Sequence, residues 1–186
     1  MRLQIRARAP ARVSPNVPTA LERLSQIDLG SLGVTRFAHR VPPLGHAVSA
    51  APGVASGRAA FDSERAKELA CSGDPVILVR RDTTTEDIAG FAVAAGILTA
   101  VGGRTAHAAV VARQLGKVCL VGCHNLSVDE AHRQAAIGDT NIRDGDWLSL
   151  DGDSGEVTIG KRDIVTEDPP ELEEVRGWRS VAARHS

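Results

Sequence analysis

The sequence predicts an α/β domain, in which short buried strands alternate with helices. Two runs, Val76–Val79 and Val118–Val121, contain only apolar residues, which is the pattern of strands covered on both faces. A third apolar strand is expected at Ile97–Val101, and the alanine-rich stretch from Ala106 to Leu115 after it is predicted to be a helix. A strand, a helix and a further strand in this order are typical of an α/β architecture.

The segment before this domain is predicted to hold one short helix at Thr19–Ile27. Thr19 can cap it, because Glu22 stands three residues later, as in a capping box. Residues 34–50 are interpreted as a linker, since they contain Pro42-Pro43 and a glycine. The N-terminal part is therefore expected to be helical in one place and irregular elsewhere.

Apolar patterns and capping residues predict the first elements of the domain. A strand is expected at Val54–Phe61, and a helix at Ser63–Cys71. The side chain of Asp62 or Ser63 is suited to cap that helix. One of the two threonines in Thr84–Thr85 is expected to cap the next helix, which has acidic residues in its favoured first turn.

The second half is predicted to end in a hairpin. Asp129–Ala136 is interpreted as a helix, and the strands Trp147–Leu150 and Val157–Ile159 are joined by a tight turn at Asp151–Gly155. The aspartates of this turn do not have the spacing of a calcium-binding loop. A last helix is expected at Pro170–Ala183, where the chain is acidic.

A glycine turn leads from the third strand into the central helix. Gly102 and Gly103 form the turn, and Thr105 can cap the helix by accepting an N–H from its first turn. His107 therefore lies in the first helical turn, and Gly116 can end the helix.

This placement favours phosphate chemistry at His107. The start of a helix has unpaired N–H groups and about half a positive charge, which disfavours imidazolium and attracts an anion. Arg104 adds a cation suited to phosphate oxygens. The alternative interpretation is a histidine that only packs or lies on the surface.

The stretch Gly102–Arg113 resembles the phosphohistidine signature of phosphoenolpyruvate-utilising enzymes, and most closely the central, swivelling domain of pyruvate phosphate dikinase. The resemblance covers residues 47–161 and implies a three-layer β/β/α fold, with an extension at 1–46 and an acidic, partly helical tail at 162–186. Further similar segments follow in the same order: Ala51–Gly57, Pro75–Arg81, Glu86–Ile88, Asp144–Gly152 and Gly155–Val157.

The resemblance implies that His107 is the catalytic residue, which carries a phosphoryl group between two distant sites. The dikinases usually have methionine at Arg104 and serine at Ala106, whereas arginine at the first position is similar to enzyme I of the sugar phosphotransferase system. In some dikinases the threonine at the position of Thr105 is a regulatory phosphorylation site; only its capping role follows from the residues themselves. The expected phosphate-binding residues are Gly102, Gly103, Arg104, Thr105 and Ala106.

The resemblance also implies partners. It suggests an ATP-grasp domain and a phosphoenolpyruvate-binding barrel on other chains, which would hold ATP or phosphoenolpyruvate and Mg²⁺, while this chain binds no cofactor itself. The chain is expected to be a phosphotransferase component rather than a complete dikinase. Three hypotheses stay open: a stand-alone carrier, one subunit or fragment of a split enzyme, and a silent module that binds or regulates a dikinase-like partner.

Composition argues against several other classes. The net charge of −1 and the aromatic content of 3% argue against nucleic-acid binding, and no apolar run is long enough to span a membrane. Three cysteines are an odd number, so a reducing cytoplasm is expected rather than a disulfide framework. The pattern Cys119-x3-Cys123-His124 lacks a second pair of ligands, so no metal site is expected.

Overall fold

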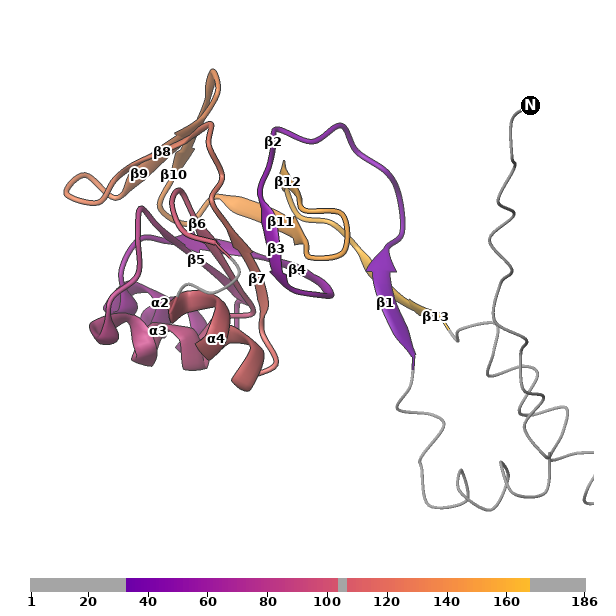
Figure 1. Ribbon diagram of the computed structural model, residues 1–186, viewed down its shortest axis with the longest axis horizontal. Coiled ribbons are helices and arrows are strands. Elements are labelled where there is room, and N and C mark those ends of the chain that lie inside the picture. The colour runs from indigo at the N-terminus through magenta and orange to yellow at the C-terminus, as the bar shows by residue number, and fades with distance from the viewer. Residues whose placement is uncertain (1–32, 104–106, 168–186) are drawn as a thin grey trace, which may run out of the picture. The chain divides into compact units, whose positions relative to one another are not determined.

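The computed structural model describes residues 33–103 and 107–167 of the chain (Figure 1). Within them, Val34–Glu167 forms one compact unit, which is wider at both ends than the predicted 47–161. The helices expected at Thr19–Ile27 and Pro170–Ala183 lie outside the described residues.

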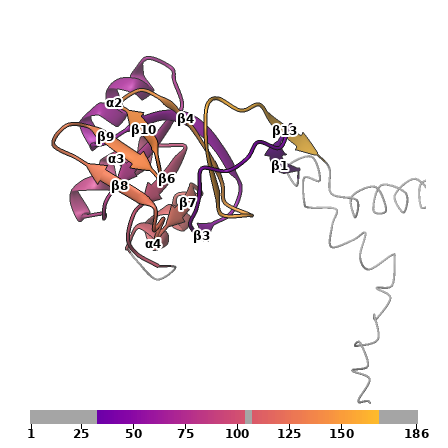
Figure 2. The same ribbon diagram turned by 90° about the horizontal axis from the view of Figure 1, so that it is seen from above.

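Four parallel strands form the centre of an eight-stranded sheet, and they lie side by side in chain order. Each is joined to the next by a helix. Because right-handed crossovers that all step in one direction place their helices on the same face, the helices cover one side of the sheet (Figures 1 and 2). The strands are β4 (Val54–Ala60), β5 (Val76–Arg80), β6 (Gly96–Thr99) and β7 (Val118–Val121), and the helices are α2 (Ser63–Cys71), α3 (Ile88–Val93) and α4 (His107–Gln114).

Capping side chains begin the first two helices as the sequence predicts. The Asp62 carboxylate accepts a hydrogen bond from the Arg65 amide at 2.7 Å and so caps α2. A 3₁₀ turn at Thr85–Asp87 leads into α3, and Thr84 is its N-cap. The Asp87 carboxylate accepts from the Thr84 amide at 2.8 Å, which is the reciprocal bond of a capping box.

Antiparallel strands extend the sheet on both sides. The predicted hairpin is confirmed as β11 and β12, while β2 and β3 come from the segment that the sequence analysis interpreted as a linker. The order is β2-β12-β11-β4-β5-β6-β7-β3, and the added strands are β2 (Gly45–His46), β3 (Val48–Ala51), β11 (Trp147–Asp151) and β12 (Glu156–Ile159).

The linker prediction is also wrong at its start. There β1 (Val34–Phe37) pairs antiparallel with β13 (Ile164–Glu167), and an ion pair between Arg36 and Glu167 joins the two strands. The partners lie about 130 residues apart in the chain, so no local pattern could indicate their pairing. The Arg36 guanidinium lowers the pKa of the Glu167 carboxyl, chiefly by hydrogen bonding to it.

A small antiparallel sheet replaces the helix expected at Asp129–Ala136. Leu126 and the alternate residues Ala135 and Ile137 are buried, which is the period of a strand, and Arg133 has a φ of 51° at the turn between two strands. The sheet consists of β8 (Leu126–Asp129), β9 (Gln134–Ile137) and β10 (Thr140–Arg143).

Two apolar cores cover the two faces of the large sheet. Alternate residues of one strand face opposite sides: Ile77 packs in the core that includes Ile137 of the small sheet, whereas Leu78 packs with Phe91 of α3. This two-sided cover explains why Val76–Val79 of β5 and all of β7 are apolar. The described chain is thus a mixed α/β domain, as predicted. None of the helices described is both long enough and apolar enough to cross a membrane.

Candidate functional site

The loop between β6 and α4 lies at the carboxyl edge of the parallel strands, where ligands commonly bind in α/β sheets. Gly102 has a φ of 108°, a backbone conformation that a side chain would disfavour and that glycine adopts readily. His107 is the first residue of α4, as the sequence places it in the first turn. Residues 104–106 lie outside the described residues, so the roles of Arg104, Thr105 and Ala106 stay predictions.

Backbone hydrogen bonds hold the start of this loop between the neighbouring strands. The Ala100 amide donates to the Arg80 carbonyl at 3.1 Å, and the Val101 amide donates to the Arg81 carbonyl at 3.0 Å. The buried Thr99 hydroxyl donates to the Val101 carbonyl at 2.6 Å. These bonds continue the β5–β6 pairing beyond both strands, so the loop begins from a fixed position.

Gly122, which follows β7, lies against the loop, and its lack of a side chain leaves space for the Gly102 carbonyl. Gly122 has a φ of 66°, and a Cβ placed on it would lie 2.7 Å from the carbonyl oxygen of Gly102. Around Gly103, by contrast, a Cβ would meet none of the described atoms within 4 Å. The two predicted loop glycines therefore have different surroundings.

Helix α4 is anchored along one side. Ala109 and Ala112 are completely buried, and the Arg113 guanidinium donates to the Ala50 carbonyl at 2.9 Å, in agreement with a structural role for this arginine. The helix ends as predicted at Gly116, whose φ is 64°. The Gly116 amide bonds to the Arg113 carbonyl and the Lys117 amide to the Ala112 carbonyl, which together form a Schellman motif. These contacts hold the middle and the C-terminal end of α4.

A charged network next to the loop was missed by sequence reasoning. The Arg80 side chain is only 16% exposed, and it contacts Asp87 at 3.2 Å and Glu130 at 3.3 Å. It also donates to the Phe61 carbonyl at 2.8 Å. The arginine pair Arg80-Arg81 at the end of an apolar strand was the available signal, but Glu130 comes from the turn after β8, in a small sheet that the sequence does not predict.

The cysteines are not arranged as metal ligands. Cys119 packs in the core on the helix side and Cys123 in the core on the opposite face, while His124 is exposed. Burial raises the pKa of the Cys119 thiol to about 12 and also raises that of Cys123. Among the residues that the structure describes, no group of three or more His, Cys, Asp or Glu side chains could hold a metal ion.

Residues 73–155 match the family model of the PEP-utilising enzyme mobile domain, where PEP is phosphoenolpyruvate. Pyruvate, phosphate dikinase 1 of Arabidopsis thaliana, named as chloroplastic, is 44% identical over 136 residues, which are 73% of this chain and 14% of that protein. The chain belongs to the mobile-domain family of PEP-utilising enzymes. Pyruvate, phosphate dikinase 2 of Zea mays is 47% identical to this mobile domain over 66% of the chain and 14% of the relative.

The similarity reaches beyond the matched range. The chloroplastic pyruvate, phosphate dikinase of Flaveria pringlei is 40% identical over 174 residues, or 89% of this chain and 18% of that protein. The chain thus spans 14–18% of the length of these curated relatives. A solution structure of an Enzyme I protein is 26% identical over 59% of this chain and 38% of that one, but its TM-score of 0.35 is too low to bear on the fold.

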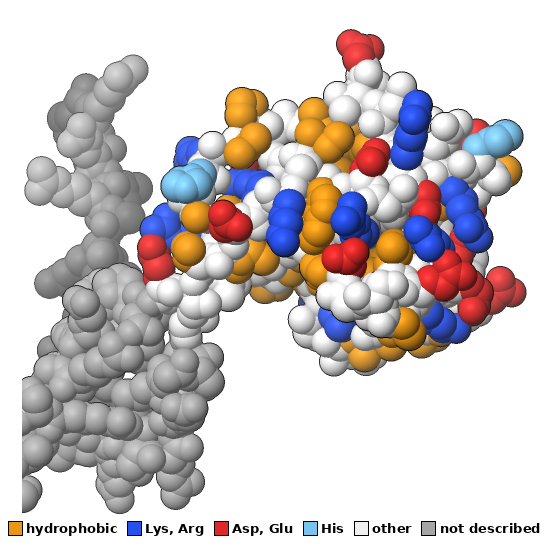
Figure 3. Space-filling view, turned by 180° about the vertical axis from the view of Figure 1, so that it is seen from behind, with side chains coloured by type: hydrophobic (Ala, Val, Ile, Leu, Met, Phe, Trp, Pro, Cys, Tyr) orange, Lys and Arg blue, Asp and Glu red, His pale blue; other side chains and the backbone are white. Residues whose placement is uncertain are grey.

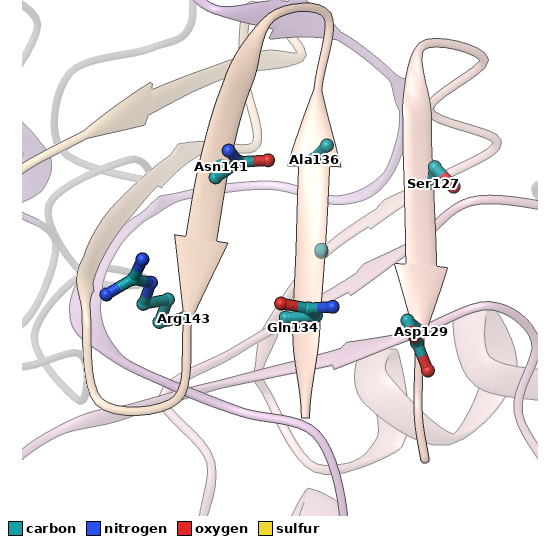
Figure 4. Close-up of a pocket in the computed structure, with 7 residues that line it drawn as sticks. Ser127, Asp129, Gln134, Ala136, Asn141 and Arg143 are labelled. Carbon is teal, nitrogen blue, oxygen red and sulfur yellow. The ribbon is translucent and has the colours of Figure 1, made fainter. Parts of the chain in front are cut away.

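A polar hollow on the small sheet is separate from the His107 loop of the mobile domain. It lies on the outer face, where two cross-strand rows of side chains stand side by side (Figure 4). Described residues of the loop do not line it. Its lining residues are Ser127, Asp129, Gln134, Ala135, Ala136, Asn141 and Arg143.

Proposed function

We propose that this mobile domain is the phosphohistidine carrier of a pyruvate phosphate dikinase-like system, and that His107 relays the phosphoryl group. The observation that carries the proposal is the position of His107 at the first residue of α4, directly after a glycine loop at the carboxyl edge of the sheet. This position joins a nucleophile to the N–H groups of a helix N-terminus. Membership of the mobile-domain family supports the same role.

The transfer consists of two substitutions at phosphorus. A ring nitrogen of His107 attacks the phosphoryl group, so that an N–P bond forms while the donor's P–O bond breaks and its electron pair stays on the leaving oxygen. In the second step an acceptor oxygen attacks, the N–P bond breaks, and the imidazole regains its lone pair. The partial positive charge at the helix start keeps the imidazole neutral before the first step and stabilises the phosphoryl oxygens after it.

The glycines and the residues between them and the helix have distinct parts in this proposal. Gly102 turns the backbone, and Gly103 leaves space for a close approach to the donor. Arg104 balances the charge of the phosphoryl oxygens, while Thr105 and Ala106 offer backbone N–H groups, and the Thr105 hydroxyl caps the helix.

The donor and the acceptor belong to other domains in this proposal. An ATP-grasp domain with ATP and Mg²⁺ would occupy one end of the relay, and a barrel with phosphoenolpyruvate or pyruvate the other. The proposal includes a three-layer swivelling arrangement; it is supported by the helices on one face of the large sheet and by the small sheet that packs on the other. A cytoplasmic location stays a prediction, and two of the relatives reported above are named as chloroplastic.

Intact mass spectrometry under alkaline conditions, in which phosphohistidine survives, tests the proposal. The pure chain is incubated with lysate of its source cell and either ATP or phosphoenolpyruvate, and we expect one phosphoryl adduct. His107→Ala should remove the adduct. His132→Ala is the matched control, because its ring is 74% exposed and lies on the turn of the small sheet, and this variant should be labelled like wild type. An adduct that persists in His107→Ala would refute the assignment, and no adduct with either donor would favour a silent interaction module.

A further inference from the structure

A second hollow lies directly beside the start of the His107 loop. Its volume is about 440 Å³. It is bounded on one side by Ala100 and Val101, which precede the loop glycines, and on the other by the segment that leads into the small sheet. The lining residues are Arg81, Ala100, Val101, His124, Leu126, Ser127 and Val128.

The hollow holds an arginine whose backbone is hydrogen-bonded and whose guanidinium has no ion-pair partner among the described residues. The Arg81 amide donates to the Glu130 carboxylate at 3.2 Å, and its carbonyl accepts from Val101 at 3.0 Å. The other oxygen of the Glu130 carboxylate contacts the Arg80 guanidinium at 3.3 Å. Glu130 thus bonds to the Arg81 backbone and to the Arg80 side chain, and within residues 33–103 and 107–167 the Arg81 guanidinium makes no ion pair or hydrogen bond.

The lining of the hollow suits an acidic ligand. Arg81 and His124 are exposed, and no carboxylate lines the hollow among the residues described. Val101 is 42% exposed and provides an apolar border. The chain as a whole has a net charge of −1, and acidic and basic side chains are interspersed over the face shown in Figure 3. Positive charge would thus attract an acidic ligand to this hollow and not to the surface as a whole.

The hollow is close enough to His107 to lie within one docking interface. Val101 and His107 are six residues apart, so their Cα atoms are separated by at most about 22 Å. A standard interface covers about 800 Å² on each partner, which corresponds to a patch roughly 30 Å across. A domain that presents a phosphoryl group to His107 therefore extends over the neighbouring surface.

We propose that this hollow docks an acidic segment of the domain that presents the phosphoryl group to His107. The inference rests on the proposed carrier function and adds the chemistry of the partner's contact. A carboxylate of the partner pairs with the Arg81 guanidinium, and apolar atoms beside it contact Val101. Because the Arg81 backbone is bonded to the loop, the contact also sets the position of the loop relative to the partner.

Charge reversal at Arg81 tests the docking contact. The rate of phosphorylation of the full chain by lysate of its source cell, with ATP or phosphoenolpyruvate, is compared between wild type and Arg81→Glu at low and at physiological salt. We expect the rate of Arg81→Glu to fall about tenfold at low salt, and the difference to shrink as salt screens the pair. Arg143→Glu is the matched control, since this arginine is also exposed but lies on the outer face of the small sheet (Figure 4). It should react like wild type.

A small phosphoryl donor distinguishes an effect of Arg81→Glu on docking from an effect on the reactivity of His107. Phosphoramidate transfers its phosphoryl group to imidazole with loss of ammonia and needs no partner domain, so Arg81→Glu and wild type should react with it at equal rates. Equal rates for Arg81→Glu and wild type in the lysate would overturn the docking inference while leaving the carrier function intact. A slower reaction of Arg81→Glu with phosphoramidate would also overturn it, because the effect would then lie in the loop. A wild-type chain that phosphoramidate labels but lysate does not would overturn the carrier function itself.

Discussion

Adding one methyl group at Gly122 should displace the start of the His107 loop, because the Gly102 carbonyl lies against Gly122. In Gly122→Ala the new Cβ lies 2.7 Å from the Gly102 carbonyl oxygen, and the two must separate by about 0.7 Å to reach an ordinary contact of 3.4 Å. Alanine must also adopt the left-handed φ of 66°. The Gly102 carbonyl belongs to the turn before α4, so the displacement is transmitted directly to the loop.

The magnitude follows from two terms. The left-handed conformation costs alanine about 1–2 kcal/mol, which the lower entropy of the unfolded chain offsets by about 0.4–1 kcal/mol. Overpacking in a tight place costs about 1–3 kcal/mol more. We therefore expect Gly122→Ala to lower the free energy of unfolding by about 1–5 kcal/mol, which corresponds to a Tm lower by roughly 3–15 °C.

Gly116→Ala is the matched control, because alanine at this position must also adopt a left-handed φ but its Cβ makes no close contact with a described atom. Gly116 has a φ of 64°, and a Cβ there would meet no described atom within 4 Å. The free energy of unfolding of Gly116→Ala should fall by at most about 1.6 kcal/mol. Thermal and denaturant unfolding followed by circular dichroism measure both variants. Amide NMR spectra should show larger shifts at Gly102 and Gly103 in Gly122→Ala than in Gly116→Ala. Equal losses of stability with unshifted loop amides would refute the argument from the close contact.

Two further predictions concern buried side chains of the domain. Arg80→Met removes the ion-pair partner of Asp87, whose side chain is only 5% exposed. Because a buried carboxylate is then left unpaired, the free energy of unfolding measured by urea titration should fall by about 3 kcal/mol. A loss under about 1 kcal/mol would mean that the ion pair contributes little to stability. A thiol reagent at pH 8 should modify one cysteine of the native chain quickly, because Cys71 is exposed whereas Cys119 and Cys123 are buried and have raised pKa values. Mass spectrometry identifies the site, and rapid labelling of Cys119 would contradict its burial.

The elements that the sequence predicts well are those with a strong local signal. Val76–Val79 and Val118–Val121 are apolar throughout because helices and the small sheet cover both faces, and each is observed as a strand within one residue of its predicted bounds. Asp62 and Gly116 mark helix ends through bonds that depend only on neighbouring residues. Local chemistry of this kind can be inferred without knowledge of the rest of the fold.

The errors occur where pairing between distant segments determines the structure. The strand Val34–Phe37 has only four residues, and its partner Ile164–Glu167 lies near the other end of the domain. In Asp129–Ala136 the alternation of inward residues is interrupted by a turn at Arg133, and the alanines there favour helix in isolation. The packing of Ala135 against the large sheet outweighs that local preference.

The candidate site divides in the same way. The glycine loop and the start of α4 at His107 follow from the motif, but the contacts that position them come from other parts of the chain. Arg81 precedes the loop by about 20 residues, and Gly122 follows it by about the same number. Their roles become visible only when strands β5, β6 and β7 lie side by side.

The two loop glycines meet different physical demands. Gly102 is required by the fold itself, because its φ is positive and its carbonyl faces Gly122 at a distance that leaves no room for a side chain there. Gly103 has no such requirement among the described residues, since neither its φ nor its surroundings exclude a Cβ. A glycine that the described part of the fold does not require, four residues before His107, is consistent with close approach of a group from outside the chain. Among the described residues, the fold thus holds the start of the loop through Gly102 and places no atom within 4 Å of a Cβ at Gly103.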